Sequence, residues 1–177
     1  MNKTIISYFQ HQLAEEAVTT RAMLKIVPAD KYDWQPHPKS MSLLRLATHV
    51  AEIAGWVQLA LDRDVLDFAT TNYQPEPFTN NKGLMDYFES RLAAGTAALK
   101  DADDSVLSKE WVMRNGEQVY YTATKGEVLR MSMSQLIHHR AQLGVYLRLL
   151  NVRIPGSYGP SADEMEESVF NEKPITA

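Results

Sequence analysis

The chain has 177 residues, of which 45% are hydrophobic and 23% charged, and its formal net charge is −4. This composition predicts a globular protein that folds as a single domain over residues 1–177, and it excludes a disordered or collagen-like chain. The negative net charge argues against nucleic-acid binding, because surfaces that bind nucleic acid are basic. The absence of cysteine excludes disulfides, thiolate nucleophiles and cysteine-based metal sites.

No targeting or membrane segment is predicted from the sequence. No apolar run approaches the roughly 20 residues that a membrane helix needs. The first ten residues carry one lysine and only the pair Ile5-Ile6 before polar residues return, which is not the pattern of a secretory signal. We therefore expect a cytoplasmic protein with no membrane partner.

The chain begins with a predicted helix over about residues 4–27. Apolar or small residues recur there at steps of three and four, as on one face of an amphipathic helix, and Pro28 closes the pattern. These positions are Leu13, Ala17, Thr20, Leu24 and Val27. A rigid connector over residues 28–38 follows, since each proline in it biases the preceding residue away from helix.

A second helix is predicted to begin near Ser40 or Ser42, either of which can cap it, and to reach Leu61. Its apolar stripe is wide enough for the core of a helical bundle. The stripe consists of Leu43, Leu46, Ala47, Val50, Ile53, Ala54, Val57 and Leu61. Residues 69–80 contain two prolines and predict a loop. A third helix follows and ends in the acidic stretch 101–104; its apolar face comprises Leu84, Tyr87, Phe88, Leu92, Gly95 and Leu99.

Residues 111–121 predict a short hairpin, because Asn115-Gly116 favours the positive φ angles of a type I′ turn. The fourth long helix is predicted over about residues 124–150, since Thr124 and Glu127 form a capping box at its start.

A rigid loop over residues 153–160 follows, and Ser161 with Glu164 forms a second capping box that opens a short acidic C-terminal helix. Helices of roughly 20 residues are rods of about 30 Å, and rods of matched length bury their apolar stripes best side by side. The sequence therefore predicts an all-α fold, four long helices with one short hairpin before the last of them.

The chain has five histidines, and their positions in the sequence predict different roles for them. His11 is predicted on the polar side of the first helix and His37 lies between two prolines, so surface or structural roles are expected for both. His49 lies on the flank of the second apolar stripe, where a half-buried imidazole needs partners for both ring nitrogens. Two interpretations of His49 remain open: a histidine at the edge of the core bonded to a neighbour, or a metal ligand.

His138 and His139 are adjacent on the fourth long helix, where successive side chains diverge by about 100°. Both rings therefore cannot face the core. Residues three or four apart share a face, so His139 shares its face with Gln135. Two histidines at this spacing are a familiar metal-binding pattern, and here glutamine holds the first position. An amide oxygen is a weak, neutral ligand for ions that prefer imidazole.

Other catalytic patterns are missing from the sequence. No serine lies in a Gly-x-Ser-x-Gly elbow, and neither glycine-rich phosphate-binding motif is present. The acidic residues of 101–104 and 164–167 lie at predicted helix ends, where solvated carboxylates are common. Trp34, Trp56 and Trp111 are expected to be core residues.

Four segments together resemble the DinB/YfiT-like superfamily, the damage-inducible-protein-like helical bundles. In chain order they are WQPHPKSMSL at 34–43, LATHVAE at 46–52, HHRAQLGVYLR at 138–148 and PGSYGPSADE at 155–164. The most specific element is His49 on the second helix combined with His-Arg-x-Gln at 139–142 on the last long helix. The resemblance spans nearly the whole chain in the right order.

The resemblance implies a DinB-like four-helix bundle with an up-down-down-up connection, commonly a homodimer, with a metal site at one end. In that family three histidines typically bind a divalent ion, often zinc or nickel. The corresponding positions here are His49, Gln135 and His139, so Gln135 departs from the pattern. His138 is expected beside the last ligand and not in place of the missing one.

This departure bears on the expected chemistry. Three imidazoles with an open fourth position can lower the pKa of bound water to about 7. Two imidazoles and an amide bind the ion less tightly, unless Glu52, a water or a small ligand completes the shell. The site is therefore expected to be weak, altered or empty.

Two functions follow from these residues and the resemblance. The first is a metal-dependent enzyme, such as a thiol-dependent transferase or a hydrolase, that acts on a small-molecule substrate or thiol, with His49, His139 and Gln135 around the ion. The alternative, motivated by Gln135, is a non-catalytic dimeric bundle whose degenerate metal site binds a small molecule or a partner. Nucleic acid is not an expected partner of either, because the chain offers no basic stripe.

Overall fold

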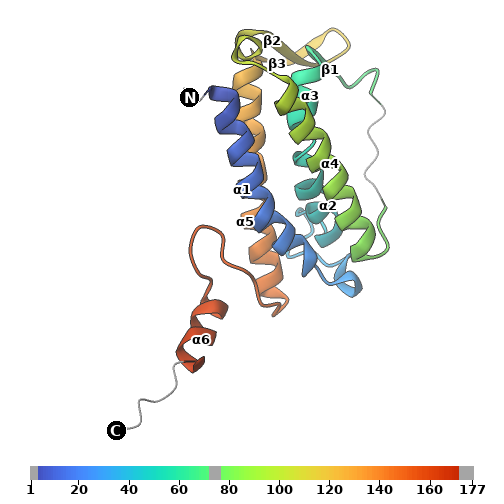
Figure 1. Cartoon of the computed structure of the whole chain (residues 1–177). Coiled ribbons are helices and arrows are strands. Elements are labelled where there is room, and N and C mark those ends of the chain that lie inside the picture. The colour runs from blue at the N-terminus through green and yellow to red at the C-terminus, as the bar shows by residue number, and fades with distance from the viewer. Residues whose placement is uncertain (1–3, 72–76, 172–177) are drawn as a thin grey trace.

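The computed structural model describes residues 4–71 and 77–171, with side chains described up to residue 166. In these ranges the fold is mostly helical and carries a small sheet (Figure 1). The helices are α1 (Ile5–Lys25), α2 (Leu43–Ile53), α3 (Trp56–Asp62), α4 (Asn81–Asp101), α5 (Lys125–Leu149) and α6 (Ala162–Asn171). The strands are β1 (Val65–Asp67), β2 (Glu110–Asn115) and β3 (Gln118–Thr124), and the short 3-10 helices are η1 (Ala29–Lys31) and η2 (Asp104–Ser108).

The long helices pack side by side. Figure 1 shows that α1 and α5 run in one direction, whereas α2, α3 and α4 run in the other. The sheet covers the end at which α5 begins, and α6 lies beyond the opposite end of α5, away from the other helices. Across the described ranges, no helix has the length and apolar character that crossing a membrane requires.

The predicted helix starts are confirmed by their caps. Thr4 accepts a hydrogen bond from the backbone of Ser7, and Ser42 accepts one from Arg45. Both capping boxes are present: Thr124 with Glu127 at α5, and Ser161 with Glu164 at α6. Each box satisfies two amides that a helix N-terminus would otherwise leave without partners.

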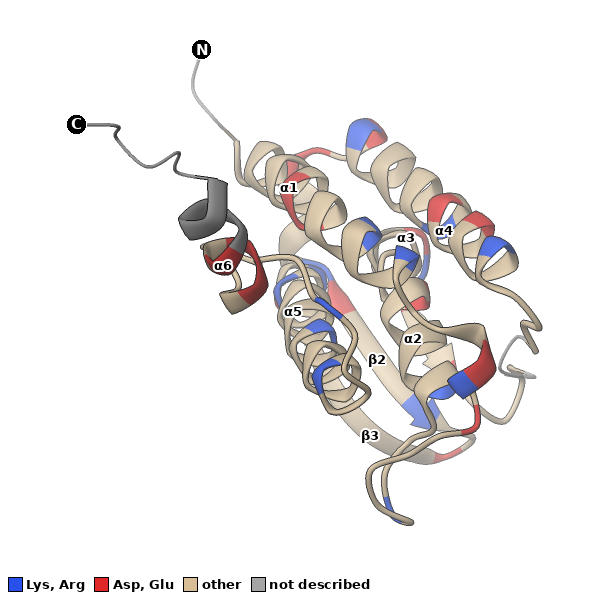
Figure 2. Ribbon diagram, turned by 90° about the horizontal axis from the view of Figure 1, so that it is seen from below, with Lys and Arg blue, Asp and Glu red and all other residues tan. Residues whose placement is uncertain are grey.

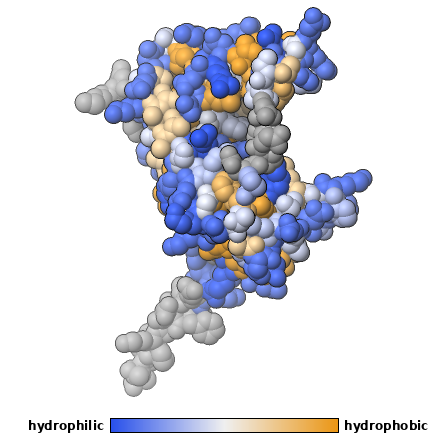
Figure 3. All heavy atoms as spheres, turned by 90° about the vertical axis from the view of Figure 1, so that its right-hand side faces the viewer, coloured by the Kyte–Doolittle hydropathy of each residue, from blue (hydrophilic) through white to orange (hydrophobic). Residues whose placement is uncertain are grey.

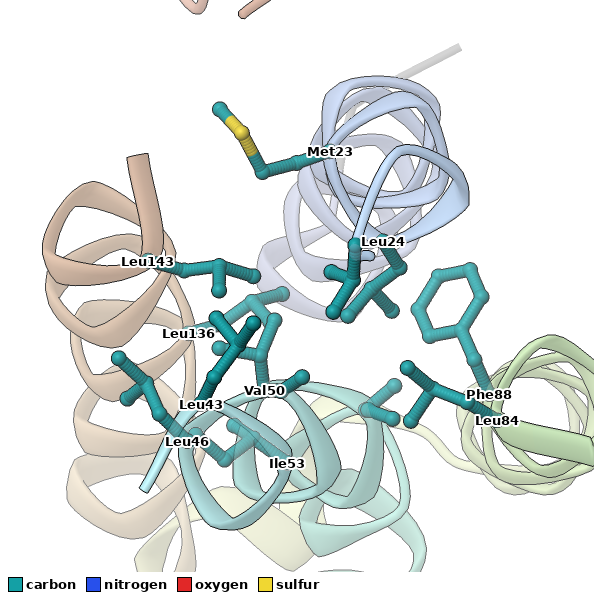
Figure 4. Packing of buried hydrophobic residues seen from close by; sticks show 14 of the residues in the cluster. Met23, Leu24, Leu43, Leu46, Val50, Ile53, Leu84, Phe88, Leu136 and Leu143 are labelled. Atoms are coloured by element: carbon teal, nitrogen blue, oxygen red, sulfur yellow. The ribbon is translucent and has the colours of Figure 1, made fainter. Parts of the chain in front are cut away.

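The core lies between α1, α2, α4 and α5 (Figure 4). The side of α2 that faces the other helices is fully buried. It meets leucine side chains from α1, α4 and α5, and a phenylalanine side chain from α4. The residues labelled there are Met23, Leu24, Leu43, Leu46, Val50, Ile53, Leu84, Phe88, Leu136 and Leu143. Seen from below, α2 and α3 lie between α4 and α5 (Figure 2). Burial of these apolar stripes holds the helices together.

The prediction that residues from about Ser42 to Leu61 form one continuous helix was wrong. This segment is divided into α2 and α3 by a turn at residues 54–55. At this break α4 approaches so closely that a Cβ on Gly95 would lie 2.4 Å from the carbonyl oxygen of Ala54. A Cβ on Gly55 would lie 3.0 Å from Cδ of Arg91. Periodicity could not show the break, because α3 continues the apolar pattern of α2.

The sheet was predicted only in part. The hairpin of β2 and β3 is confirmed, but the parallel strand β1, which pairs Leu66 with Met113, was not predicted. The expected all-α fold is therefore a mostly helical fold with three strands in the order β1-β2-β3. The turn type was also wrong: Gly116 has a φ of +59°, whereas Asn115 has no positive φ. Positive φ at the first of two loop residues alone is the pattern of a type II′ turn.

A buried ion pair joins α5 to α1. Arg140 is 1% exposed, and its Nη1 lies 2.6 Å from Oε2 of Glu16, which is 6% exposed. Arg140 also donates to the backbone oxygen of Glu16 and to Oγ1 of Thr20. The hydroxyl of Tyr158, in the loop after α5, donates to Oε1 of Glu16. Because Arg140 follows His139 in the chain, this network fixes the rotation of α5 where the histidines lie.

Candidate functional site

The packing of α2 against α5 brings His49 and His139 into contact. Their ring centroids are 4.5 Å apart, and the rings meet edge to face at 73°. The side chain of His49 is 12% exposed, and His139 is partly buried. His49 also packs edge-on against Trp56, the first residue of α3, with ring centroids 5.4 Å apart. The two imidazoles expected to lie together are therefore neighbours, although 90 residues separate them in the chain.

Each ring has an oxygen partner on its own helix for one nitrogen. Nδ1 of His49 lies 2.5 Å from Oε1 of Glu52, and Nδ1 of His139 lies 2.9 Å from Oε1 of Gln142. A carboxylate oxygen only accepts, so a neutral His49 carries its proton on Nδ1. The same assignment for His139 follows from the amide oxygen of Gln142. Both Nε2 atoms then keep a lone pair, and an oxygen that holds Nδ1–H is the usual support of a metal-binding histidine.

A divalent ion can be tested against this geometry. Two imidazoles bound to one tetrahedral ion at about 2.0–2.1 Å have ring centroids about 5 Å apart. The observed 4.5 Å between His49 and His139 is close to that separation. Gln135 lies one helical turn before His139 and is partly buried. However, within residues 4–71 and 77–171 no group of three or more His, Asp or Glu side chains is arranged to hold a metal ion. The ring separation is therefore compatible with two imidazole ligands, and the third expected ligand is an amide.

The other histidines lie outside this pair. His138 is exposed, with its ring centroid 4.9 Å from that of His139. His11 is exposed beside Glu15, and His37 is exposed and accepts a hydrogen bond from the backbone of Lys39. These positions agree with the surface and structural roles expected for His11 and His37.

The surroundings favour the neutral form of His139. Burial is the largest influence and lowers the pKa of His139, while the hydrogen bond with Gln142 opposes that change. Electrostatic interactions with His49, His138 and Arg45 lower this pKa further. A neutral imidazole is the form that binds a metal ion, so proton competition at this position is weak at neutral pH.

A pocket of about 360 Å³ opens beside His49. Its walls are apolar and come from α3, the sheet and the first part of α5, including Trp56, Leu66, Trp111 and Met131. The polar residues Arg45, His49 and Glu52 of α2 line it together. Its volume falls in the range of small-molecule sites.

The sequence did not reveal this pocket, because its walls depend on the break before α3 and on the unexpected strand β1. Trp56 and Trp111 were expected in the core; Trp111 is 2% exposed but also lines the pocket. Arg45 was not singled out, although its spacing from His49 and Glu52 on one helix was a usable signal. Nη1 of Arg45 lies 3.7 Å from Oε1 of Glu52.

The chain is similar to one known family and to solved structures. The model of the DinB family matches residues 1–173. No curated protein matches. A DinB-like protein from Bacillus cereus is 20% identical with a TM-score of 0.67, over 89% of this chain and 100% of that one. A DinB-like protein from Bacillus subtilis is 18% identical with a TM-score of 0.66, over 85% and 97% of the two chains.

A third similar structure is described as a possible member of the DinB family from Exiguobacterium sibiricum. It is 20% identical, with a TM-score of 0.61 over 85% of this chain and 95% of that one. At these identities the three structures show a shared fold and carry no information on activity.

Proposed function

Because the family model covers nearly the whole chain, the chain belongs to the DinB family, and from this premise we propose that it is a metal-dependent enzyme that acts on a small molecule. In this proposal the long helices form the up-down-down-up four-helix bundle of the family, and the protein is a homodimer. The reaction is a thiol-dependent transfer or a hydrolysis. The observation that carries the proposal is the contact of His49 with His139, each with Nδ1 held by an oxygen, at the edge of an apolar pocket.

The proposed ligands of a zinc or nickel ion are His49 and His139 through Nε2, with Gln135 as a weak third ligand. Such an ion, when bound, acts as a Lewis acid that lowers the pKa of a bound water or thiol. The other roles belong to the chain itself. Glu52 orients His49 and Gln142 orients His139 through their hydrogen bonds. The apolar walls exclude water from the substrate, which strengthens electrostatic interactions in the site.

A second function is favoured by one specific observation. Within the described residues no three His, Asp or Glu side chains form a metal-binding group. The alternative is therefore a non-catalytic dimeric bundle in which the metal site is degenerate and the pocket binds a small molecule or a partner.

Metal titration tests the first proposal. Isothermal titration of the purified protein with zinc and with nickel is expected to show one ion per chain. His49→Ala and His139→Ala are each expected to abolish this uptake, whereas His37→Ala, in the exposed connector, is the matched control and should leave it unchanged. A protein that takes up neither ion at micromolar concentration refutes metal dependence.

Gln135→His separates the two functions. If Gln135 faces the ion, an imidazole there completes a three-histidine site and raises zinc affinity by at least about tenfold, which is about 1.4 kcal/mol. A large gain over a barely measurable starting affinity favours the degenerate site. Unchanged affinity shows that residue 135 does not face the ion. Gln118→His, on exposed β3, is the control for non-specific binding by an added histidine.

A further inference from the structure

We infer that the pocket beside His49 binds a small molecule with a ring-bearing apolar body and one polar head group, the body against the walls and the head at Arg45 and His49. This names the substrate class of the proposed function, on which it rests for the chemistry at the head group. Binding of the apolar body needs no metal ion, so the two proposals can fail separately.

The sheet supplies one wall through its alternation of side chains. Trp111 and Met113 are two residues apart on β2 and therefore point to the same side. Leu66 pairs with Met113 across the parallel ladder and joins them. All three residues line the pocket. Figure 3 shows apolar side chains gathered among hydrophilic ones at the end of the molecule that carries the sheet.

Helices α3 and α5 supply the remaining walls. Trp56 and Leu59 come from α3, and Val128 and Met131 come from the first turns of α5. Ser132 also lines the pocket, but its hydroxyl donates to the backbone oxygen of Val128. That hydroxyl hydrogen is thus already used within the helix.

The polar end is set by the spacing of residues on two helices. On α5, Met131, Gln135 and His139 recur at steps of four, so one face leads from the pocket wall to the histidine pair. On α2, Arg45 and Glu52 lie within one turn of His49 and line the pocket with it. Arg45, whose Nη1 lies 3.7 Å from Oε1 of Glu52, is the Lys or Arg side chain among the residues that line the pocket, so it is the lining group that attracts a negatively charged head.

The shape and polarity of this space identify the occupant. A volume of about 360 Å³ suits one small molecule and is far too small for a helix of a partner protein. Two tryptophans, Trp56 of α3 and Trp111 of β2, line the space, and aromatic side chains pack favourably against rings. The polar groups are concentrated at the α2 end. A ligand that is polar throughout would therefore lose hydrogen bonds to water in the pocket, and the apolar walls would not replace them.

The test uses two fluorescent probes with the same ring system, N-phenylnaphthylamine and its sulfonated analogue anilinonaphthalene sulfonate. Both are titrated into the full chain with a metal chelator present. We expect saturable binding of one probe per chain. Met131→Trp and Leu66→Trp each fill the pocket and should weaken binding of both probes by at least about tenfold. Leu149→Trp adds the same side chain at an exposed position of α5 and should leave binding unchanged.

Probe emission is excited where tryptophan does not absorb, and circular dichroism verifies that each variant is folded. Two filling variants on different elements keep the test valid if one of them does not fold. Arg45→Gln should weaken binding of the sulfonate by about tenfold and of the uncharged probe by less than about twofold, because a charge-assisted hydrogen bond is lost only with the sulfonate.

The outcomes separate the two proposals. Absence of saturable binding to the wild-type chain, or equal binding to the folded filling variants, overturns this inference even if metal uptake is stoichiometric. Equal losses of both probes in Arg45→Gln overturn the placement of the head group. Probe binding that depends on the pocket, in a chain that takes up no metal, supports this inference and refutes only the proposed metal chemistry.

Discussion

Replacing Arg140 with methionine is expected to destabilise the protein more than most single substitutions. Arg140 is 1% exposed, and its Nη1 lies 2.6 Å from Oε2 of Glu16. Methionine fills part of the space but leaves the Glu16 carboxylate, 6% exposed, without its cation. The hydroxyl of Tyr158, 2.7 Å from Oε1, remains as a neutral donor. A buried charge that has lost its partner is the main source of the expected loss.

The expected decrease in the free energy of unfolding is about 3–5 kcal/mol, the usual cost of removing one partner of a buried ion pair. For a chain of this size the melting temperature falls by about 2–4 °C per kcal/mol, so a decrease of about 6–20 °C is expected. Arg140→Met with Glu16→Leu should recover most of this loss, because an apolar pair of similar volume is often as stable as the ion pair. Lys82→Met is the control: Lys82 pairs with Asp86, both are exposed, and its loss should cost less than about 1 kcal/mol.

Urea denaturation followed by circular dichroism, together with scanning calorimetry, measures these differences. A loss below about 1 kcal/mol in Arg140→Met would show that the buried carboxylate is accommodated by other means. A double variant as unstable as Arg140→Met would show that the loss comes from packing and not from the uncompensated charge.

Three further predictions concern the site and the helix packing. Glu52→Gln should lower zinc affinity by about 10- to 100-fold, because it weakens the hydrogen bond that orients His49; isothermal titration measures it. The pKa of His139 is lowered in the folded protein, so the unfolded chain takes up a proton first as the pH falls below about 6.5. The free energy of unfolding should therefore fall between pH 7 and 5, and fall less in His139→Gln, as urea denaturation across that range can show. Gly95→Ala should destabilise by about 1–3 kcal/mol through overpacking, whereas Gly144→Ala, whose Cβ would meet side-chain atoms no closer than 3.6 Å, should be neutral or stabilising by up to about 1 kcal/mol in thermal melts.

Each of these three predictions would be contradicted by a specific result. Unchanged zinc affinity in Glu52→Gln would mean that the orientation of His49 does not limit binding. Identical pH dependence of stability in the wild-type chain and His139→Gln would mean that His139 titrates alike in the folded and unfolded states. Equal effects of Gly95→Ala and Gly144→Ala would mean that the close approach of α4 to the break before α3 does not restrict residue 95.

Local signals in the sequence were sufficient for the starts of α1, α2, α5 and α6. The capping boxes of Thr124 with Glu127 and Ser161 with Glu164 act over three residues, so short-range chemistry alone places the starts of α5 and α6. The turn at Gly116 was expected as a turn but not as its type, because the dipeptide Asn115-Gly116 does not fix which residues occupy the loop. Helical spacing also placed Gln135 on the face of His139.

The sequence by itself determined the long helices, the hairpin and the candidate status of His49 and His139, because each depends on residues a few positions apart. Tertiary structure alone decided the break before α3, the strand β1 and the pocket between them. The break accompanies the approach of α4 at Gly95, and β1 exists because three residues find a partner in β2 more than 40 positions later. Such contacts depend on which surfaces meet in space, and a pattern along the chain carries no direct record of them.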